Sequence, residues 1–193
     1  MKALLIAAAF LAVTAAHAAE DPIYWAAIKK GLYAQRSKDD AAVIKHYTDA
    51  LEAPDMPATE LGSSYGVRGD AWRRKGDLDR ALADYTAGIA AQPSLLPLHI
   101  ARGEAFLAEG ELDKALADFE QVLKVNADYS SAYTGRGRVK VRKGDLDGGI
   151  ADFDQSLKRW TDPAGAAERE VALRLKSSPP KPAAATAAAT VAA

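Results

Sequence analysis

The 193-residue chain contains no cysteine. This absence excludes disulfides, thiolate metal sites, a nucleophilic cysteine and a lipidated amino-terminal cysteine. The chain also lacks a large excess of either charge, because 25 basic residues nearly balance 26 acidic ones. The net charge of −1 therefore does not favour non-specific nucleic-acid binding, which needs a basic surface. With 14 glycines and 9 prolines, the composition is that of an ordinary globular chain rather than a disordered one.

Residues 1–18 have the layout of a secretory signal peptide. Met1-Lys2 is a positive start, residues 3–16 carry no charge, and Ala16-His17-Ala18 supplies both small residues of an A-x-A cleavage site. We predict cleavage after Ala18, export across the inner membrane to the periplasm, and no stable membrane insertion afterwards. An uncleaved anchor and an ordinary buried helix are the alternatives, but the apolar stretch is shorter than the roughly 20 residues that span a bilayer.

Three segments of the chain align without gaps at a constant interval. Two glycine positions, one aspartate position and one aromatic position recur in the same phase in all three segments. The recurring residues are Gly69, Gly103 and Gly137; Gly76, Gly110 and Gly144; Asp84, Asp118 and Asp152; and Tyr85, Phe119 and Phe153.

This pattern resembles the tetratricopeptide repeat family, whose 34-residue unit has the same period and reads W-x2-L-G-x2-Y, then A-x3-F, then P. The resemblance implies an all-α fold, a right-handed α-solenoid of antiparallel helix pairs. We place repeats at residues 62–95, 96–129 and 130–163. The chain departs from the family pattern at Arg68, Arg102 and Arg136, which replace the leucine before the first glycine.

Less regular segments flank the three repeats. Residues 19–61 are predicted to hold a degenerate first repeat, in which Gly31 matches the first glycine, followed by a linker marked by Pro54 and Pro57. Residues 164–176 are predicted to form a capping helix with Val171, Leu173 and Leu175 as its apolar positions. The Pro/Ala-rich residues 177–193 lack large apolar side chains and are predicted to be disordered.

The recurring residue types have physical reasons. Gly69 and its counterparts lack a Cβ and so allow close helix packing, while Tyr85 and its counterparts fill the space between layers. Gly76 and its counterparts stand where a left-handed residue is needed to end the first helix. The acids that follow them, Asp77 and Asp145 above all, are candidate N-caps of the second helix.

Combinations that could support catalysis are few. Gly62-Ser63-Ser64-Tyr65-Gly66 matches G-x-S-x-G, but the hydrolase motif needs a strand before it, and a helix start is expected here. After cleavage only His46 and His99 remain, without metal-ligand spacing. We therefore expect no enzyme, no metal and no cofactor, and we expect His99 to be packed rather than ligating.

The recurring arginines and aspartates have two interpretations. They could form an anion-binding ladder, but their equal number and phase favour a structural ladder of Arg–Asp pairs between paired helices. The basic run at residues 136–143 is interpreted first as a solvated helix face and second as an anion-facing end of the groove; nucleic-acid binding is the least favoured interpretation.

In the family that the chain resembles, the first helices of the repeats line a concave face that binds a peptide. The leading interpretation is thus a protein-interaction scaffold of the envelope, and the alternative is a binder of an anionic non-protein ligand, such as an envelope polymer, through Arg138, Arg142 and Lys143. The carboxylate-clamping Lys/Asn arrangement of some family members is absent, so no chaperone-tail recognition is predicted. The groove positions carried over from the family are Trp25, Ile28, Leu32 and Gln35; Ser63, Gly66, Asp70 and Arg73; Pro97, Ile100, Glu104 and Leu107; and Ser131, Thr134, Arg138 and Val141, with Arg142 added at the basic end.

Overall fold

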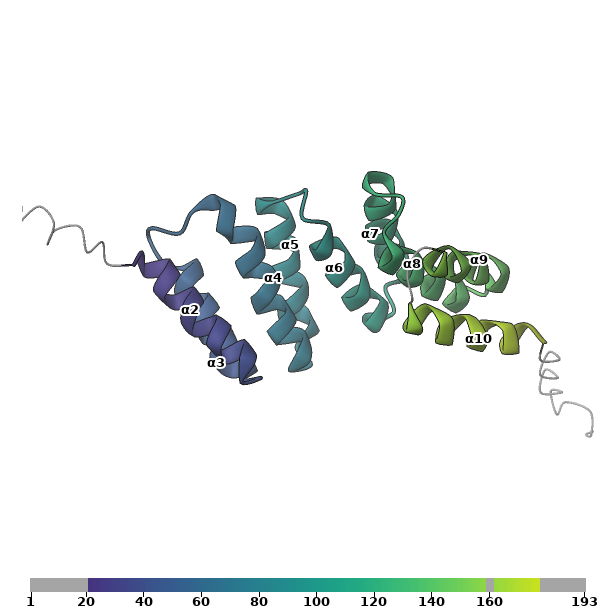
Figure 1. Ribbon diagram of the computed structural model, residues 1–193, viewed down its shortest axis with the longest axis horizontal. Coiled ribbons are helices and arrows are strands. Elements are labelled where there is room, and N and C mark those ends of the chain that lie inside the picture. The colour runs from purple at the N-terminus through teal and green to yellow at the C-terminus, as the bar shows by residue number, and fades with distance from the viewer. Residues whose placement is uncertain (1–20, 159–161, 178–193) are drawn as a thin grey trace, which may run out of the picture. The chain divides into compact units, whose positions relative to one another are not determined.

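The computed structural model describes residues 21–158 and 162–177, and its regular structure in these ranges is entirely helical (Figure 1). The predicted all-α fold is confirmed. The predicted signal peptide and residues 178–193 lie outside the described residues. The helices of the described part are α2 (Ile23–Arg36), α3 (Asp40–Leu51), α4 (Ala58–Arg74), α5 (Leu78–Ala91), α6 (Leu96–Glu109), α7 (Leu112–Val125), α8 (Ser130–Arg142), α9 (Leu146–Leu157) and α10 (Pro163–Ser177).

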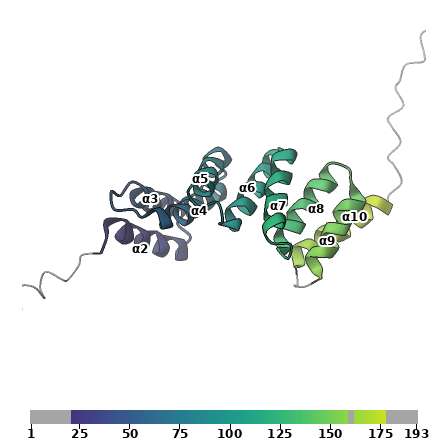
Figure 2. The same ribbon diagram turned by 90° about the horizontal axis from the view of Figure 1, so that it is seen from above.

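The chain divides into two compact units, residues 1–98 and residues 99–193. In the first unit α2 packs on α3, α3 on α4, and α4 on α5; in the second unit α7 packs on α8, α8 on α9, and α9 on α10 (Figure 2). Short turns join the members of each pair, which makes paired helices antiparallel. Helix α4 begins at Ala58, inside the segment that the sequence assigned to the linker.

An aromatic ring of the second helix rests on a glycine of the first helix in every pair. A Cβ placed on Gly69 would lie 2.8 Å from Cε1 of Tyr85, and one on Gly103 would lie 2.9 Å from Cε1 of Phe119. The same contact joins Gly137 to Phe153 and Gly31 to Tyr47. The predicted close packing at these glycines is confirmed, and the Gly31–Tyr47 contact establishes α2 and α3 as a pair of the same kind.

The turn inside each pair uses a left-handed residue. Gly76, Gly110 and Gly144 have φ values of +82°, +83° and +87°, as predicted. Lys38 holds this place in the first pair with φ +56°, a conformation that costs a non-glycine residue about 1 kcal/mol. The acid after this residue caps the next helix in three turns: Asp39, Asp77 and Asp145 accept from the backbone N–H of Ala42, Arg80 and Gly148, whereas Glu111 makes no side-chain cap.

The linker between α3 and α4 also closes the start of α2. The Asp55 carboxylate accepts hydrogen bonds from the backbone N–H groups of Ile23 at 2.7 Å and Tyr24 at 3.2 Å. Pro22 before α2 offers no side-chain cap. Asp55 therefore satisfies first-turn donors that the local sequence leaves open.

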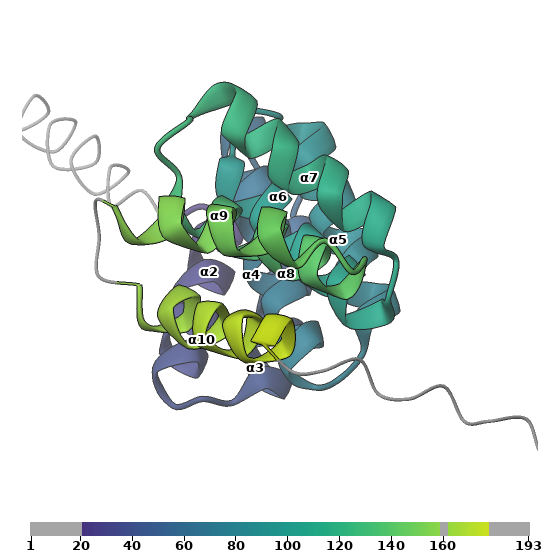
Figure 3. The same cartoon turned by 90° about the vertical axis from the view of Figure 1, so that its right-hand side faces the viewer.

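Helix α10 packs through small residues. Gly165 and Ala172 are its buried positions, and the helix lies mainly on α9 (Figure 3). Of the three apolar positions expected of this helix, Leu173 is half-buried, whereas Val171 and Leu175 are 50% and 52% exposed. Residues seven positions apart share one face of a helix, and this small-residue face brings the α10 backbone close to α9.

Candidate functional site

The recurring arginines and aspartates form a structural ladder. Arg68 Nη2 lies 2.7 Å from Asp84 Oδ1 and Arg68 Nε lies 2.9 Å from Oδ2. Arg102–Asp118 and Arg136–Asp152 repeat this bidentate geometry. The three carboxylates are 3–5% exposed. The structural interpretation is confirmed, because these arginines already hold buried carboxylates and are not available to an external anion.

Hydrogen bonds across the ladder shift the pKa of its cations. The hydrogen bonds that Arg68 donates to Asp84 raise the pKa of Arg68, and those that Arg136 donates to Asp152 raise the pKa of Arg136. The negative charge of Glu120 on α7 adds to the second effect. His99 adds a further contact in the second repeat, since its Nδ1 lies 3.1 Å from Asp118 Oδ1 and the residue is 8% exposed. His99 is thus packed, as predicted.

In the first unit, the predicted groove residues separate into exposed and core positions. Trp25 and Leu32 are 38% and 43% exposed on α2, seven positions apart on one face. Ile28 is 6% exposed and belongs to the core with Val43 and Tyr47, so its assignment as a groove contact is corrected. The residue lies between the two exposed positions but turns against α3, where packing removes it from solvent.

Asp70 and Arg73 of α4 are partly engaged by their neighbours. The Tyr85 hydroxyl donates to Asp70 Oδ1 at 2.7 Å, and Arg73 Nη2 lies 3.7 Å from the same oxygen. Burial, followed by the hydrogen bond to Asp70, raises the pKa of Tyr85. Asp70 therefore joins the predicted groove surface to the aromatic core of its pair.

In the second unit, Arg138 of α8 bridges two neighbouring helices, α6 and α10. Its Nη1 donates to both oxygens of Glu104 at 3.0 and 2.9 Å, and its Nε donates to Glu168 of α10 at 3.1 Å. The guanidinium is thus neutralised by two carboxylates. The positive groove end that the sequence predicted is corrected at this position.

The remaining predicted residues of this unit are also engaged. Leu107 is 4% exposed and lies in the core with Phe119, and Ile100 packs against the same cluster. Arg142 Nη1 donates to the Leu107 carbonyl. Leu107 is therefore a core residue rather than a groove contact.

A cavity of about 330 Å³ opens beside Arg138. Asp162 lies on its wall, accepting from the Thr134 hydroxyl at 2.5 Å and from the Gly165 backbone N–H at 3.0 Å. Burial opposes ionisation of Asp162, but the hydrogen bonds from Gly165, Thr134 and Ser156 hold its pKa below the usual value. The lining residues are Glu104, Ser130, Ser131, Thr134, Arg138, Asp162 and Ala164.

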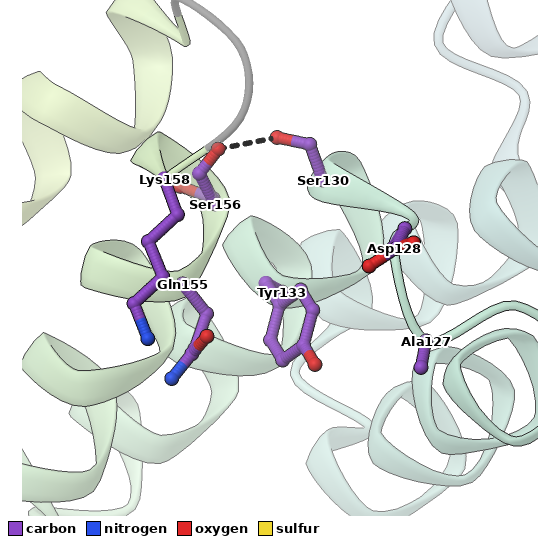
Figure 4. Close-up of a pocket in the computed structure, with 7 residues that line it drawn as sticks. All are labelled: Ala127, Asp128, Ser130, Tyr133, Gln155, Ser156 and Lys158. Carbon is purple, nitrogen blue, oxygen red and sulfur yellow. Dashed lines mark hydrogen bonds between the residues drawn. The ribbon is translucent and has the colours of Figure 1, made fainter.

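A second recess of about 360 Å³ lies between the α7–α8 turn and the end of α9 (Figure 4). The Ser130 hydroxyl donates to the Ser156 carbonyl at 2.9 Å across one side of it, and the Tyr133 ring forms part of its wall. None of the predicted groove residues lines this recess. Its walls hold no assembled acid, base and nucleophile, so it supplies no catalytic arrangement.

The G-x-S-x-G match does not form a nucleophile elbow. Ser64, the central serine, lies within α4, where it is 1% exposed and its hydroxyl makes no hydrogen bond. An elbow needs the serine exposed on a strand-to-helix turn. The part of the chain that the structure describes contains no group of three His, Asp or Glu side chains that could hold a metal. In the same ranges, no helix has both the length and the apolar composition of a bilayer-spanning segment.

Sequence reasoning missed Asp162, Glu168 and Asp55. The pair Asp162-Pro163 could have been recognised, since an N-cap acid followed by proline at the first helical position marks a helix start. Glu168 and Asp55 carry no comparable signal, because their partners lie 30 to 32 residues away in sequence.

Comparisons with known proteins agree with this geometry. Residues 100–163 match the family model of the tetratricopeptide repeat. No curated protein matches the chain. A tetratricopeptide repeat protein from Parabacteroides merdae is similar in structure, with a TM-score of 0.70 at 21% identity, covering 79% of this chain and 60% of that one.

Two further solved structures contain bound peptides. The second TPR domain of human RPAP3, in complex with an HSP70 peptide, has a TM-score of 0.56 at 25% identity and covers 61% of this chain and 98% of that one. The first TPR of Spaghetti (RPAP3), bound to an HSP90 peptide, has a TM-score of 0.58 at 21% identity and covers 62% of this chain and 95% of that one. The class of protein is therefore a TPR-like all-α repeat protein.

Proposed function

We propose that this protein is a non-catalytic scaffold of the periplasm that binds a peptide segment of a partner protein on the first helices of its repeats. The observation that carries the proposal is the 330 Å³ cavity of the second unit. Glu104, Ser131, Thr134 and Arg138 line it, and all four are groove positions that the repeat pattern assigned. Rigid helices that present a cavity at such positions suit recognition of a peptide by anchors at fixed spacing.

The first unit, taken by itself, exposes apolar side chains that suit contact with a partner protein. Trp25 and Leu32 expose large apolar side chains on one face of α2, and Lys29 lies 6.0 Å from the Trp25 ring centroid. Tryptophan is among the side chains that most often dominate the binding energy at protein interfaces. We infer that apolar side chains of the partner contact α2.

The charges of the second unit disfavour an acidic peptide. Arg138 is held between Glu104 and Glu168, and Asp162 adds a third carboxylate near the same cavity. The peptides bound to the two RPAP3 domains, SRMEEVD and SGPTIEEVD, both end in acidic residues. We therefore infer a partner segment that is neutral or basic where it meets α8.

The alternative, an anionic envelope polymer, would need free cations. Besides Arg138, Arg142 is bonded to the Leu107 carbonyl, and Lys143 lies 2.6 Å from Asp113. These contacts favour the peptide. The dependence of affinity on salt concentration distinguishes the two alternatives. A polymer held by charge loses affinity steeply as ionic strength rises, whereas a peptide held by apolar anchors does not.

Site-specific photo-crosslinking in cells tests the groove. A photoreactive residue at Ser131, in the cavity, is expected to capture one defined protein, and the same residue at Ala117, on the exposed side of α7, is expected to capture none. Equal capture at both sites would rule out the groove. Recovery of a chain beginning at Ala19 in the osmotic-shock fraction would support the periplasmic setting, and retention of Met1 in the cytoplasm would refute it.

A further inference from the structure

Polar contacts join the second helix of a pair to the first helix that follows it at three junctions, α3–α4, α7–α8 and α9–α10. One row lies near the end of the first helix and consists of Arg74–Asp40 at 2.7 Å, Lys143–Asp113 at 2.6 Å, and Lys176–Asp147. A second row lies about two turns earlier and includes Arg68–Thr48 at 3.0 Å and Arg169–Asp154 at 2.6 Å. At the α7–α8 junction no direct contact occupies this place, but Glu120 is near enough to Arg136 to contribute to its raised pKa. Each of these junctions thus matches two cations with two oxygen-bearing side chains.

The two oxygen-bearing side chains of each second helix are similarly spaced. On the second helix the two positions are seven or eight residues apart, which is two helical turns and therefore one stripe. The pairs are Asp40 and Thr48 on α3, Asp113 and Glu120 on α7, and Asp147 and Asp154 on α9. Because the first-row acid stands at the start of its helix and its cation stands near the end of the next one, the contacting helices run antiparallel.

Helix α2 carries the same two cations. Lys30 and Arg36 precede Arg68 and Arg74 by the same interval that separates Gly31 from Gly69. Both residues are exposed, and neither makes a hydrogen bond or ion pair with any residue that the structure describes. Among the described helices α2 is the first, so no second helix precedes it there to supply the matching acids.

A cavity of about 480 Å³ lies on this same face of the first pair. Lys30 and Tyr33 line it from α2, and Ala42 and His46 line it from α3. Tyr33 is 76% exposed, whereas its counterpart in α4, Ala71, is fully buried against the preceding pair. The face therefore has the residues of a junction, but no helix among the described residues covers it.

The charge of this face is basic. His46 occupies the position of the ladder aspartates, so Lys30 has no buried carboxylate partner within its own pair. Asp39, the acid that lines the cavity, is already used to cap α3. Lys29 at the rim pairs with Asp21 at 2.5 Å, which leaves Lys30 and Arg36 as the cations aligned for a visiting helix.

We propose that this end face binds an amphipathic helix of a partner protein, antiparallel to α2, with two acidic residues seven positions apart. The two carboxylates of the partner helix pair with Lys30 and Arg36, and a small apolar residue of that helix packs on Tyr33. This site adjoins the proposed peptide contacts Trp25 and Leu32, because Arg36 follows Leu32 by four positions on α2.

A second copy of the chain does not offer the acidic complement at its last helix. Helix α10 exposes Val171 and Leu175, and its last turn is basic, with Arg174 and Lys176 already paired to Glu170 and Asp147. The second helices that carry acid stripes are packed into their own pairs through buried aromatics such as Phe119 and Phe153. The occupant is therefore assigned to another protein.

The chain itself supplies a defined probe. A labelled peptide of residues 111–126 presents Asp113 and Glu120, the stripe that α8 receives, and its matched control carries Asp113→Asn and Glu120→Gln. Fluorescence anisotropy with the exported chain, residues 19–193, is expected to show binding of the first peptide and about fivefold weaker binding of the control, which corresponds to two exposed charge pairs.

Variants of the chain locate the site. Lys30→Glu with Arg36→Glu should abolish the preference for the acidic peptide, whereas Lys45→Glu, an exposed lysine of α3, and Trp25→Ala with Leu32→Ala should leave it intact. Circular dichroism checks that each variant folds. No binding, equal binding of both peptides, or loss only in the Trp25 and Leu32 variant overturns the proposal. Sedimentation that shows a dimer lost on Lys30→Glu identifies a second copy as the occupant and also overturns it. The groove test at Ser131 is independent of every one of these results.

Discussion

The first helix pair and the three later pairs reach one architecture with different polar residues. All four place an aromatic ring on a glycine of the partner helix. Only the later pairs hold a buried Arg–Asp pair, and only they turn on glycine, since the first pair has Lys30 and His46 in the ladder and Lys38 in the turn. The comparison teaches that the glycine–aromatic contact is common to all four described pairs, whereas the buried Arg–Asp pair can be absent without loss of the helix pair.

Substitution of the arginine in the Arg–Asp ladder is the sharpest test of this comparison. Arg68→Met is expected to lower the free energy of unfolding by about 3–5 kcal/mol, because it leaves the Asp84 carboxylate buried and unpaired. Lys30→Met, the counterpart in the first pair, should change it by less than about 0.5 kcal/mol. Urea denaturation measures both variants. Equal losses would mean that the two pairs do not differ as described.

Overpacking the shared contact gives the next largest effect. In Gly103→Leu the new side chain meets the Phe119 ring, and a cost of about 1–3 kcal/mol or more is expected. Ser131→Ala, at an exposed position of the same unit, is the control and should be nearly neutral. Melting temperatures measured by circular dichroism compare the two, and the same temperature for both would contradict the repeat alignment.

The first and last described helices differ in how they are capped. Asp162→Ala should lower stability by up to about 2 kcal/mol, since it removes the N-cap of α10 and the acceptor of the Thr134 hydroxyl. The pKa of Asp162 is lowered on folding, so its contribution is complete above the unfolded value of about 3.9 and is lost as the pH falls through the folded value. The gap between wild type and variant should therefore close in acid. A gap that stays constant down to about pH 2 would exclude ionised Asp162 as its source.

The turn residues give the smallest expected difference. Lys38→Gly should raise the free energy of unfolding by about 1 kcal/mol, because glycine adopts the left-handed conformation without a steric penalty. Gly76→Lys should lower it by a similar amount. Denaturant midpoints determine the sign of each change, and a loss of stability in Lys38→Gly would contradict the assignment.

Much of the fold could be predicted because it depends on residues that recur at the same position of each repeat. Gly69 with Tyr85, the left-handed Gly76 and the Asp77 cap are each set by short-range spacing that recurs. The candidate site was less predictable: Ile28 and Leu107 have the right phase for a groove, yet both lie in the core. The position of a residue in the repeat predicts the side of the helix on which its side chain lies. Whether that side chain is buried depends on which neighbouring helix packs against it.

The amino-acid sequence alone determined the helix pairs, their turns and the Arg–Asp ladder, because these depend on local geometry that recurs in every repeat. Tertiary structure alone decided which charges are free. Arg138 is neutralised by acids 34 and 30 residues away, whereas Lys30 and Arg36 have no partner among the described residues. Charge pairing between helices depends on contacts through space, and a single chain's sequence does not specify those contacts until the helices are packed.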